Sequence, residues 1–351
     1  MGWRQYIFCN GWRSELLMPI SRKIMGVSKG RVFTGALSGT STIAAGTAPR
    51  GVCISADGKS VYAVSSGNVQ IFDRNTTTGA LSGTSTIAAG SGVWDTCISA
   101  DGASVYVTNS NSNTISIFSR NVSTGALSGT STIATGSRPY GICISADGTS
   151  VYTANYIGST VSIFSRNVST GALSGTSTIA ATNPYSVCIS ADGTSVYASN
   201  FGNATVQIYS RNTSTGALTS GGTIAAGTNP WGICISADGK SVYSANRGSD
   251  TVSIFSRNVS TGALSGTSTI AASYVQLICV SSDGVSVYCT NLVGQIVSIF
   301  SRNVSTGALS GTSTIAAGDE PYGICISADG TNVYSTGNGS GSNKVHIFTR
   351  S

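Results

Sequence analysis

Short apolar runs alternate with turn-forming residues along most of this chain. Between residues 139 and 180, β-branched and aromatic residues dominate the runs 141–145, 151–155 and 161–165, and turn residues such as Asp-Gly separate them. A fourth run, 173–181, consists mainly of Ser, Thr, Gly and Ala. Runs of this length and composition predict four short β-strands, of which the first is fully buried and the last faces solvent.

This unit of four strands recurs about every 45 residues. A Thr-Gly-Ala-Leu marker begins at Thr34, Thr78, Thr124, Thr170, Thr215, Thr261 and Thr306, and an Asp-Gly marker begins at Asp57, Asp101, Asp147, Asp192, Asp238, Asp283 and Asp329. A repeat of this length with several short strands is typical of a propeller blade. We therefore predict an all-β fold, a seven-bladed β-propeller of four-stranded blades in residues 34–351, preceded by a basic extension in residues 1–33.

The repeats also predict how the ring closes. The first repeat enters at a fourth-strand segment, 37–45, and the last repeat ends at a third strand, 344–348. The outer strand of the last blade must then come from the N-terminal side of the repeats. We expect segments 37–45 and 344–348 to pair, because closure removes the free edges of the inner strands.

The residues of one repeat resemble a known family. The sequence PYGICISADGTSVYTAN begins at Pro139 and is followed by VSIFSRN and TGAL. This pattern resembles the repeats of the seven-bladed propellers of the lactonase-like and YVTN-repeat group, and the resemblance covers residues 34–350. Because Pro, Asp-Gly and Val-Tyr serve turns and packing, the resemblance implies the architecture. As an alternative function, it implies a hydrolase that acts on a sugar lactone.

Charge is sparse and unevenly distributed. Only 9% of the residues are charged, and the net charge is +6. The repeats lack the basic clustering of a nucleic-acid-binding surface, and no apolar stretch has the length of a membrane-spanning helix. We expect neither a nucleic-acid partner nor membrane insertion. The basic extension is expected either to dock on an acidic partner or to be a solvated tail; its charges are Arg4, Arg13, Arg22, Lys23, Lys29 and Arg31 against Glu15.

The cysteines bear on the cellular compartment. Seven of the nine occupy one position in each repeat: Cys53, Cys97, Cys143, Cys188, Cys234, Cys279 and Cys325. Neighbouring blades pack about 10 Å apart, whereas a disulfide requires Cα atoms within about 7 Å. We predict reduced, buried side chains between the blades, with a ring of metal ligands as the alternative. Reduced thiols and the lack of a secretory signal in residues 1–33 indicate folding in a reducing compartment.

Two sets of loops define two rims of the ring. The loops from first to second strands and from third to fourth strands form what we call the constant rim, since their sequences hardly change. Five arginines are expected beside five aspartates on this rim, as exposed turn pairs worth about 0–1 kcal/mol each. An anion-binding collar is the alternative. These residues are Arg120, Arg166, Arg211, Arg257 and Arg302, with Asp101, Asp147, Asp192, Asp238 and Asp283.

The opposite rim, which we call the variable rim, comprises the loops from fourth to first strands and from second to third strands. Its sequences differ between blades and carry many aromatic residues, whose flat amphipathic faces suit sugar or peptide ligands. Half of these rings are expected to wedge between blades instead. The predicted ligand-binding residues are Trp94, Tyr140, Tyr156, Tyr185, Phe201, Trp231, Arg247 and Tyr322, and Tyr274 lies on the same rim.

Candidate catalytic residues are few. The only histidine, His346, lies in the closing strand, and no set of nucleophile, base and orienting residue is visible. We predict no cofactor, no metal and no catalytic residue, and hence a non-enzymatic protein that binds a glycan or protein through the variable rim. The lactone hydrolase remains the alternative; its charged groups would come from Asp95, Asp319, Glu320, Arg50, Arg138 and Arg247.

The outer strands add a hypothesis about assembly. They are long, uncharged and expected to be flat, although exposed edges usually carry charges or proline. Together with the basic extension, they indicate a homo-oligomer or a subunit of a larger assembly, for instance on a virion or a surface structure.

Overall fold

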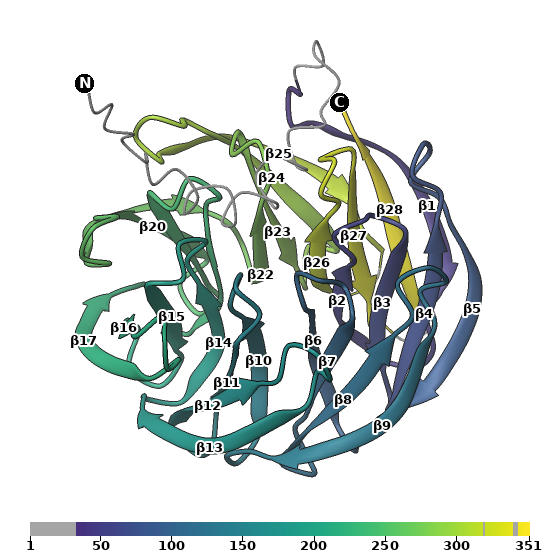
Figure 1. Cartoon of the computed structure of the whole chain (residues 1–351). Coiled ribbons are helices and arrows are strands. Elements are labelled where there is room, and N and C mark those ends of the chain that lie inside the picture. The colour runs from purple at the N-terminus through teal and green to yellow at the C-terminus, as the bar shows by residue number, and fades with distance from the viewer. Residues whose placement is uncertain (1–32, 319, 340–342) are drawn as a thin grey trace, which may run out of the picture. The chain divides into compact units, whose positions relative to one another are not determined.

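The computed structural model describes residues 33–351, except residue 319 and residues 340–342. Residues 33–351 form one compact unit. In the described part of the chain, strands β1 to β28 form seven antiparallel sheets of four strands, which surround a common axis (Figure 1). The predicted fold class is confirmed. The predicted extension lies outside the described residues apart from Phe33.

The blades are numbered here by their innermost strand. Blades 1 to 3 comprise β2 (Pro49–Ile54), β3 (Ser60–Ser65), β4 (Asn68–Arg74), β5 (Leu81–Ala88), β6 (Val93–Ile98), β7 (Ser104–Asn109), β8 (Thr114–Arg120), β9 (Leu127–Ala134), β10 (Pro139–Ile144), β11 (Ser150–Asn155), β12 (Thr160–Arg166) and β13 (Leu173–Ala180). Blades 4 and 5 comprise β14 (Pro184–Ile189), β15 (Ser195–Asn200), β16 (Thr205–Arg211), β17 (Leu218–Ala225), β18 (Pro230–Ile235), β19 (Ser241–Asn246), β20 (Thr251–Arg257) and β21 (Leu264–Ala271).

Blade 6 comprises β22 (Val275–Val280), β23 (Ser286–Asn291), β24 (Ile296–Arg302) and β25 (Leu309–Ala316). Blade 7 combines β26 (Pro321–Ile326), β27 (Asn332–Gly337) and β28 (Lys344–Arg350) with β1 (Leu37–Ala44) from the other end of the propeller. In this blade, β1 runs antiparallel to β28, and the pairs extend from Leu37 with Arg350 to Ala44 with Lys344. The predicted closure is confirmed.

The second strand of each blade is the most buried. All six residues of β11, for example, are buried, whereas the last two residues of β10 are partly exposed. The prediction that the first strand is fully buried was therefore wrong. The innermost strand lines the axis of the ring and has a neighbouring strand on one edge only. The second strand lies between two strands of its own sheet and is covered on both faces by neighbouring blades.

The outer strands are irregular rather than flat. In β1 the pairing register shifts between Ser38 and Thr40, and the intervening Gly39 has a φ of +62°. An added Cβ at Gly39 would meet nothing within 4 Å, so its backbone angle, not crowding, favours glycine. A bulge bends and twists an edge strand and so protects it from pairing. The expectation of flat edges was wrong, and it no longer supports assembly through the outer strands.

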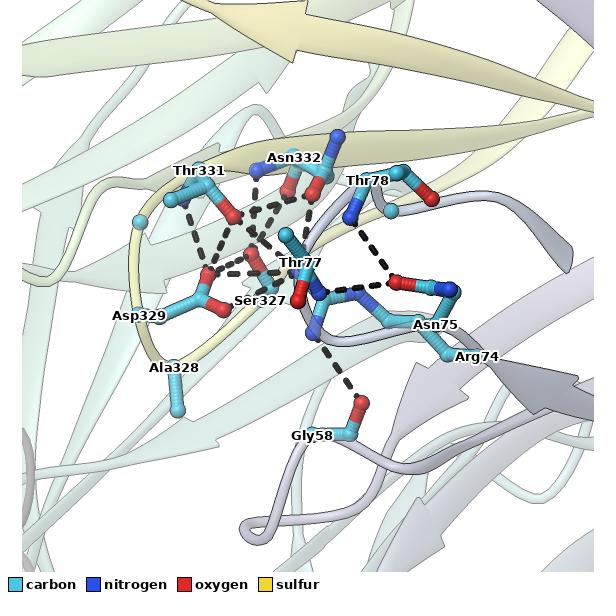
Figure 2. Close-up of polar contacts among 12 residues, drawn as sticks. Gly58, Arg74, Asn75, Thr77, Thr78, Ser327, Ala328, Asp329, Thr331 and Asn332 are labelled. Carbon is cyan, nitrogen blue, oxygen red and sulfur yellow. Dashed lines mark hydrogen bonds and ion pairs between the residues drawn. The ribbon is translucent and has the colours of Figure 1, made fainter.

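Each pair of neighbouring blades is joined on the constant rim by one arginine. Figure 2 shows the contact in which Arg74 of blade 1 reaches blade 7. The Arg74 guanidinium donates to the Tyr334 hydroxyl at 2.6 Å, to Asp329 Oδ2 at 3.0 Å and to Asn332 Oδ1 at 2.8 Å. It also donates to the Gly58 carbonyl of its own blade at 3.1 Å. One cation thus satisfies acceptors on both blades.

The same contact recurs around the ring. The seven ion pairs of the described residues are Arg74–Asp329, Arg120–Asp57, Arg166–Asp101, Arg211–Asp147, Arg257–Asp192, Arg302–Asp238 and Arg350–Asp283. The arginine side chains are 0–1% exposed, and each pairs with the aspartate of the preceding blade. The prediction of exposed turn pairs was wrong, because the loop of one blade covers the guanidinium of the next. An anion-binding collar is excluded as well, since the guanidinium groups are enclosed.

The repeat cysteines contribute to the packing between blades. All eight cysteines of the described residues are free thiols. The seven repeat cysteines are partly buried against clusters that span neighbouring blades, and Cys289 is fully buried. Burial raises the pKa of the Cys53 thiol to about 12. In residues 33–351, outside the gaps, no group of potential metal ligands converges. The predicted filler role of these side chains agrees with this packing. Among the residues described, no helix has the length and apolar character needed to cross a membrane.

Candidate functional site at the variable rim

The variable rim holds the strained backbone positions of the protein. Among the described residues, every non-glycine residue with a positive φ lies in its loops: Ala48, Ser66, Asn113, Arg138, Ser159, Asn183, Ala204, Asn229, Asp250, Tyr274, Gln295 and Glu320. On the constant rim the positive-φ positions are glycines, such as Gly58 and Gly148. Left-handed conformations of other residues cost about 1–3 kcal/mol each and cluster at functional sites. The variable rim therefore holds more backbone strain than the constant rim.

Aromatic side chains gather where the innermost strands begin. Tyr140, Tyr185, Trp231 and Tyr322 are each only 5–8% exposed and form one cluster. Trp94, Tyr156, Phe201 and Leu277 pack against it. We call the seven aromatic residues among these eight the aromatic cap. The structure therefore brings together seven of the eight predicted ligand-binding residues, and their role in binding stays a prediction.

The cap is continuous from one side of the ring to the other. Ring centroids lie 4.0 Å apart for Trp94 and Tyr140, 4.7 Å for Tyr140 and Tyr185, and 3.7 Å for Tyr185 and Trp231. The Tyr185 and Tyr322 hydroxyl groups lie 3.0 Å apart. Burial raises the pKa of both hydroxyls, so both stay protonated and one donates to the other. The three ring contacts join neighbouring blades 2 to 5, whereas the Tyr185–Tyr322 contact joins blades 4 and 7 and therefore crosses the axis.

Beneath the cap lies a small space that contains Asp95. The space is lined by Asp95, Gly141, Ser186 and Leu277 and has a volume of about 10 Å³, enough for about one water molecule. Asp95 Oδ1 accepts from the Thr96 amide at 2.8 Å, and Oδ2 accepts from the Ile142 amide of the next blade at 3.4 Å. Burial raises the pKa of Asp95 to about 6. The space is too small for a sugar, so Asp95 is not a binding group for one.

Two arginines lie over tryptophans at the edges of the cap. The Arg50 Cζ atom is 3.7 Å from the ring centroid of Trp94 and 5.5 Å from that of Tyr322. The Arg247 Cζ atom is 4.6 Å from the ring centroid of Trp231. A guanidinium held over an aromatic face is oriented by the ring and keeps its edge donors available.

Each arginine lines an open pocket. The larger, with a volume of about 300 Å³, is lined by Phe201, Asn229, Arg247, Gly248, Asp250 and Tyr274, and we call it the Arg247 pocket. The second has a volume of about 170 Å³ and is lined by Ala48, Arg50, Ser66, Gly92, Val93, Trp94, Ser110 and Asn111; we call it the Arg50 pocket. A volume near 300 Å³ matches the lower range of small-molecule sites.

The Arg247 pocket combines a cation, a carboxylate and aromatic faces. Asp250 is exposed, and its Oδ1 accepts from the Tyr274 amide at 2.6 Å. Tyr274 is 45% exposed. Among the described residues, neither Arg247 nor Asp250 belongs to an ion pair. Both charged groups are therefore free to act on a ligand.

The other predicted charged residues fall outside these pockets. Glu320 and Arg138 are exposed on the variable rim, and Asp319 lies outside the described residues. His346 is 5% exposed near the start of β28, and its ring packs against Gly318 of the variable rim. Sequence reasoning missed Asp250 and Asn229 as site residues. The sequence feature that could have identified them is their position in loops of blade 5, close along the chain to Trp231 and Arg247.

A further hollow of about 450 Å³ lies on the constant rim, between blades 1 and 2. Its floor includes Arg74 and Arg120, whose guanidinium groups are already bound to Asp329 and Asp57. The hollow also contains Lys59 and Asp73, which belong to no ion pair of the described residues, but no aromatic side chain lines it. Without an aromatic face for a sugar ring, it is a weaker candidate for a sugar site than the variable rim.

The comparisons with known proteins agree with the architecture. The family described as "Lactonase, 7-bladed beta-propeller" matches residues 86–189 and 179–277. The chain belongs to this lactonase family. No curated protein matches the sequence significantly.

Solved structures share the fold at low sequence identity. A Bacteroides fragilis protein described provisionally as a 6-phosphogluconolactonase has a TM-score of 0.70 at 21% identity, covering 78% of this chain and 86% of that one. The periplasmic gluconolactonase of Pseudomonas aeruginosa has a TM-score of 0.68 at 15% identity, with the same coverage of 78% and 86%. Hydrazine synthase of Kuenenia stuttgartiensis has a TM-score of 0.69 at 18% identity, covering 92% and 99%. Such different enzymes on one fold show that the site, not the fold, decides function.

Proposed function

We propose that this protein is a lactonase-like hydrolase that opens a sugar lactone in the Arg247 pocket. One observation carries the proposal. The Arg247 guanidinium and the Asp250 carboxylate line the same pocket of a lactonase-family propeller, and neither belongs to an ion pair of the described residues. The sequence alone favoured a non-enzymatic binding protein and kept the lactone hydrolase as the alternative; we now favour the hydrolase.

The pocket residues suggest how a lactone would bind. Phe201 and Tyr274 offer aromatic faces to the apolar side of a sugar ring, and the Asn229 side chain offers an amide for its hydroxyl groups. The guanidinium of Arg247 would face the lactone carbonyl. Its planar donors suit an oxygen that becomes negative during the reaction.

Asp250 supplies a base for hydrolysis. Its Oδ1 is held by the Tyr274 amide, which fixes the carboxylate and leaves Oδ2 for a water molecule. The water oxygen attacks the carbonyl carbon while Oδ2 takes one of its protons, and Arg247 stabilises the oxyanion. The carbon–ring-oxygen bond then breaks, and the ring oxygen receives the proton from Asp250. The product is the open hydroxy acid, and atoms and charges balance.

Kinetics on gluconolactone test the proposal. Asp250→Asn should lower kcat about a hundredfold or more, because general-base catalysis contributes about 10²–10⁴-fold. Arg247→Gln should lower kcat and raise KM. Asp73→Asn changes an exposed carboxylate on the constant rim and serves as the control, with no change expected. Turnover that survives Asp250→Asn unchanged would contradict the assigned base.

A second candidate is a binding module without catalysis. The observation that favours it is the aromatic cap, in which Trp94, Tyr156 and Phe201 remain partly exposed while the other rings support them. If the protein shows no turnover of sugar lactones but binds glycans through these rings, this candidate replaces the hydrolase. Isothermal titration with the lactone and with its hydrolysed acid separates the two.

A further inference from the structure

The arginines of the described residues divide into two groups. Seven are enclosed at blade junctions in ion pairs, as described above. The other three, Arg50, Arg138 and Arg247, belong to no ion pair of the described residues, and all three lie on the variable rim. Two of these three are held over tryptophan rings. Free cations fixed by aromatic rings on one face indicate that this face recognises anionic groups.

The two arginine–tryptophan pairs lie on opposite sides of the aromatic cap. Arg50 and Trp94 belong to blades 1 and 2, whereas Trp231 and Arg247 belong to blade 5. Blade 5 is three blades from each of the others, which is the largest separation that a ring of seven allows. Between the two tryptophans, Tyr140 and Tyr185 continue the stack of rings. The two pockets therefore lie at opposite ends of one continuous run of aromatic rings.

The Arg50 pocket differs from the Arg247 pocket in its charge. Its lining contains the guanidinium of Arg50, the hydroxyl groups of Ser66 and Ser110, the Asn111 amide and the Trp94 ring, and no carboxylate. It has no base for hydrolysis. Its groups instead match a sugar that carries a carboxylate, since the cation would bind the acid, the Asn111 amide the sugar oxygens, and the ring the sugar face. The Ser66 and Ser110 hydroxyls donate to the Thr47 and Gly92 carbonyls, so their oxygens would accept from sugar hydroxyl groups.

We propose that the Arg50 pocket is a second, non-catalytic subsite that binds a carboxylate-bearing sugar unit of an extended acidic oligosaccharide, whose other end occupies the Arg247 pocket. The assignment of the far end rests on the proposed function. The Arg50 subsite itself depends only on the geometry of its own pocket. Joining two sites through one ligand raises affinity, because the second contact forms within the complex.

Calorimetry with three ligands tests the subsite: galacturonic acid, trigalacturonic acid and the neutral trisaccharide maltotriose. The acidic trimer should bind at least about tenfold more tightly than the monomer and than maltotriose. Arg50→Gln should reduce affinity for the acidic trimer about tenfold and leave affinity for the neutral maltotriose unchanged. Arg138→Gln is the matched control, because Arg138 is an exposed, unpaired arginine of the same rim. It should change neither quantity.

The outcomes separate the two proposals. Equal binding of maltotriose and trigalacturonic acid, or trimer binding that Arg50→Gln leaves unchanged, would overturn the subsite. Binding of triglutamate in place of the acidic trisaccharide would overturn it too, since it would indicate a peptide ligand. Arg50-dependent trimer binding without lactone turnover would preserve the subsite and remove only the proposed hydrolysis. An unchanged melting temperature of the Arg50→Gln variant confirms that any loss of binding is not unfolding.

Discussion

The Tyr185 and Tyr322 hydroxyl groups lie 3.0 Å apart, although the two residues belong to blades 4 and 7. Blades this far apart in the ring do not touch through their sheets, because each sheet packs on its two neighbours. The hydrogen bond therefore closes the central channel on the side of the variable rim. Any ligand of this rim meets the cap, and the space around Asp95 is separated from it by aromatic rings.

The first prediction concerns the cap. Trp231→Ala should lower the free energy of unfolding by about 3 kcal/mol or more, because the indole is 8% exposed and contacts three other side chains in the cap and at its edge. The sequence alone predicted this residue as a ligand-binding aromatic and did not decide whether its ring wedges between blades. Chemical denaturation of the variant checks the value. Phe201→Ala is the comparison, with a smaller loss expected because Phe201 is partly exposed.

The sequence predicted the blades because each local signal repeats seven times. Asp-Gly turns, apolar runs of five residues and the regular marker spacing agree with one another, so an error in one blade is corrected by the others. The repeats could not reveal that the Arg166 side chain is buried. The sequence places it next to a turn, whereas its burial depends on the loop of a neighbouring blade, to which no local pattern points.

The second prediction concerns that arginine. Arg166→Ala should lower the free energy of unfolding by about 2–4 kcal/mol, since the guanidinium is 0% exposed and its removal leaves buried acceptors unpaired. Among these are the Tyr106 hydroxyl at 2.7 Å and the Gly148 carbonyl at 3.1 Å. Arg138→Ala, at an exposed position, should change it by less than about 0.5 kcal/mol. A loss below about 1 kcal/mol for Arg166→Ala would contradict the buried assignment.

The third prediction concerns backbone strain. Gln295 has a φ of +53° in a loop of the variable rim. Gln295→Gly should raise the free energy of unfolding by about 1 kcal/mol, because glycine adopts this region without the penalty of a Cβ. Gln295→Ala keeps the Cβ and should give no such gain. Thermal unfolding of the two variants side by side measures the difference, and equal melting temperatures would argue against strain at this loop.

The fourth prediction concerns the thiols. Burial raises the pKa of Cys53, Cys188 and Cys279 to about 12, and the thiolate is the reactive form. In the native protein at pH 8, these cysteines should react with a thiol reagent at least a hundredfold more slowly than in urea. Mass spectrometry of labelled peptides identifies the sites. Rapid native labelling, or a disulfide between blades, would show that the thiols are not enclosed as described.

The candidate site was less predictable than the fold. The sequence pointed to the variable rim and to its aromatic residues, because they interrupt an otherwise constant repeat. It could not show that Tyr185 and Tyr322 meet across the axis, since that contact depends on the diameter of the channel. The sequence did not assign Asp250 to the site, because one acid in a loop has no periodic signal. Its importance follows from the pocket that places it with Arg247.

The last prediction concerns the pH dependence of stability through Asp95. Its ordinary pKa of 3.8 is raised by burial to about 6 in the folded protein. Between about pH 4 and pH 6 the native state therefore binds more protons at this site than the unfolded state does. Stability falls wherever the unfolded state binds fewer protons, so this contribution declines as pH rises through the window and is constant on either side.

Two variants isolate that contribution. Asp95→Asn cannot ionise, and Asp95→Gly restores the residue that blades 1, 3, 5 and 7 carry at this position, as in Gly51 and Gly141. Relative to the wild type, each variant should gain roughly 1–3 kcal/mol in unfolding free energy between pH 4 and pH 7. The constant-rim aspartates, such as Asp101, have a lowered pKa, so their contribution to the pH dependence of stability lies below about pH 4. Urea titrations at several pH values measure the gain. If the difference in unfolding free energy between each variant and the wild type did not depend on pH, Asp95 would be solvated and would lie outside the closed channel.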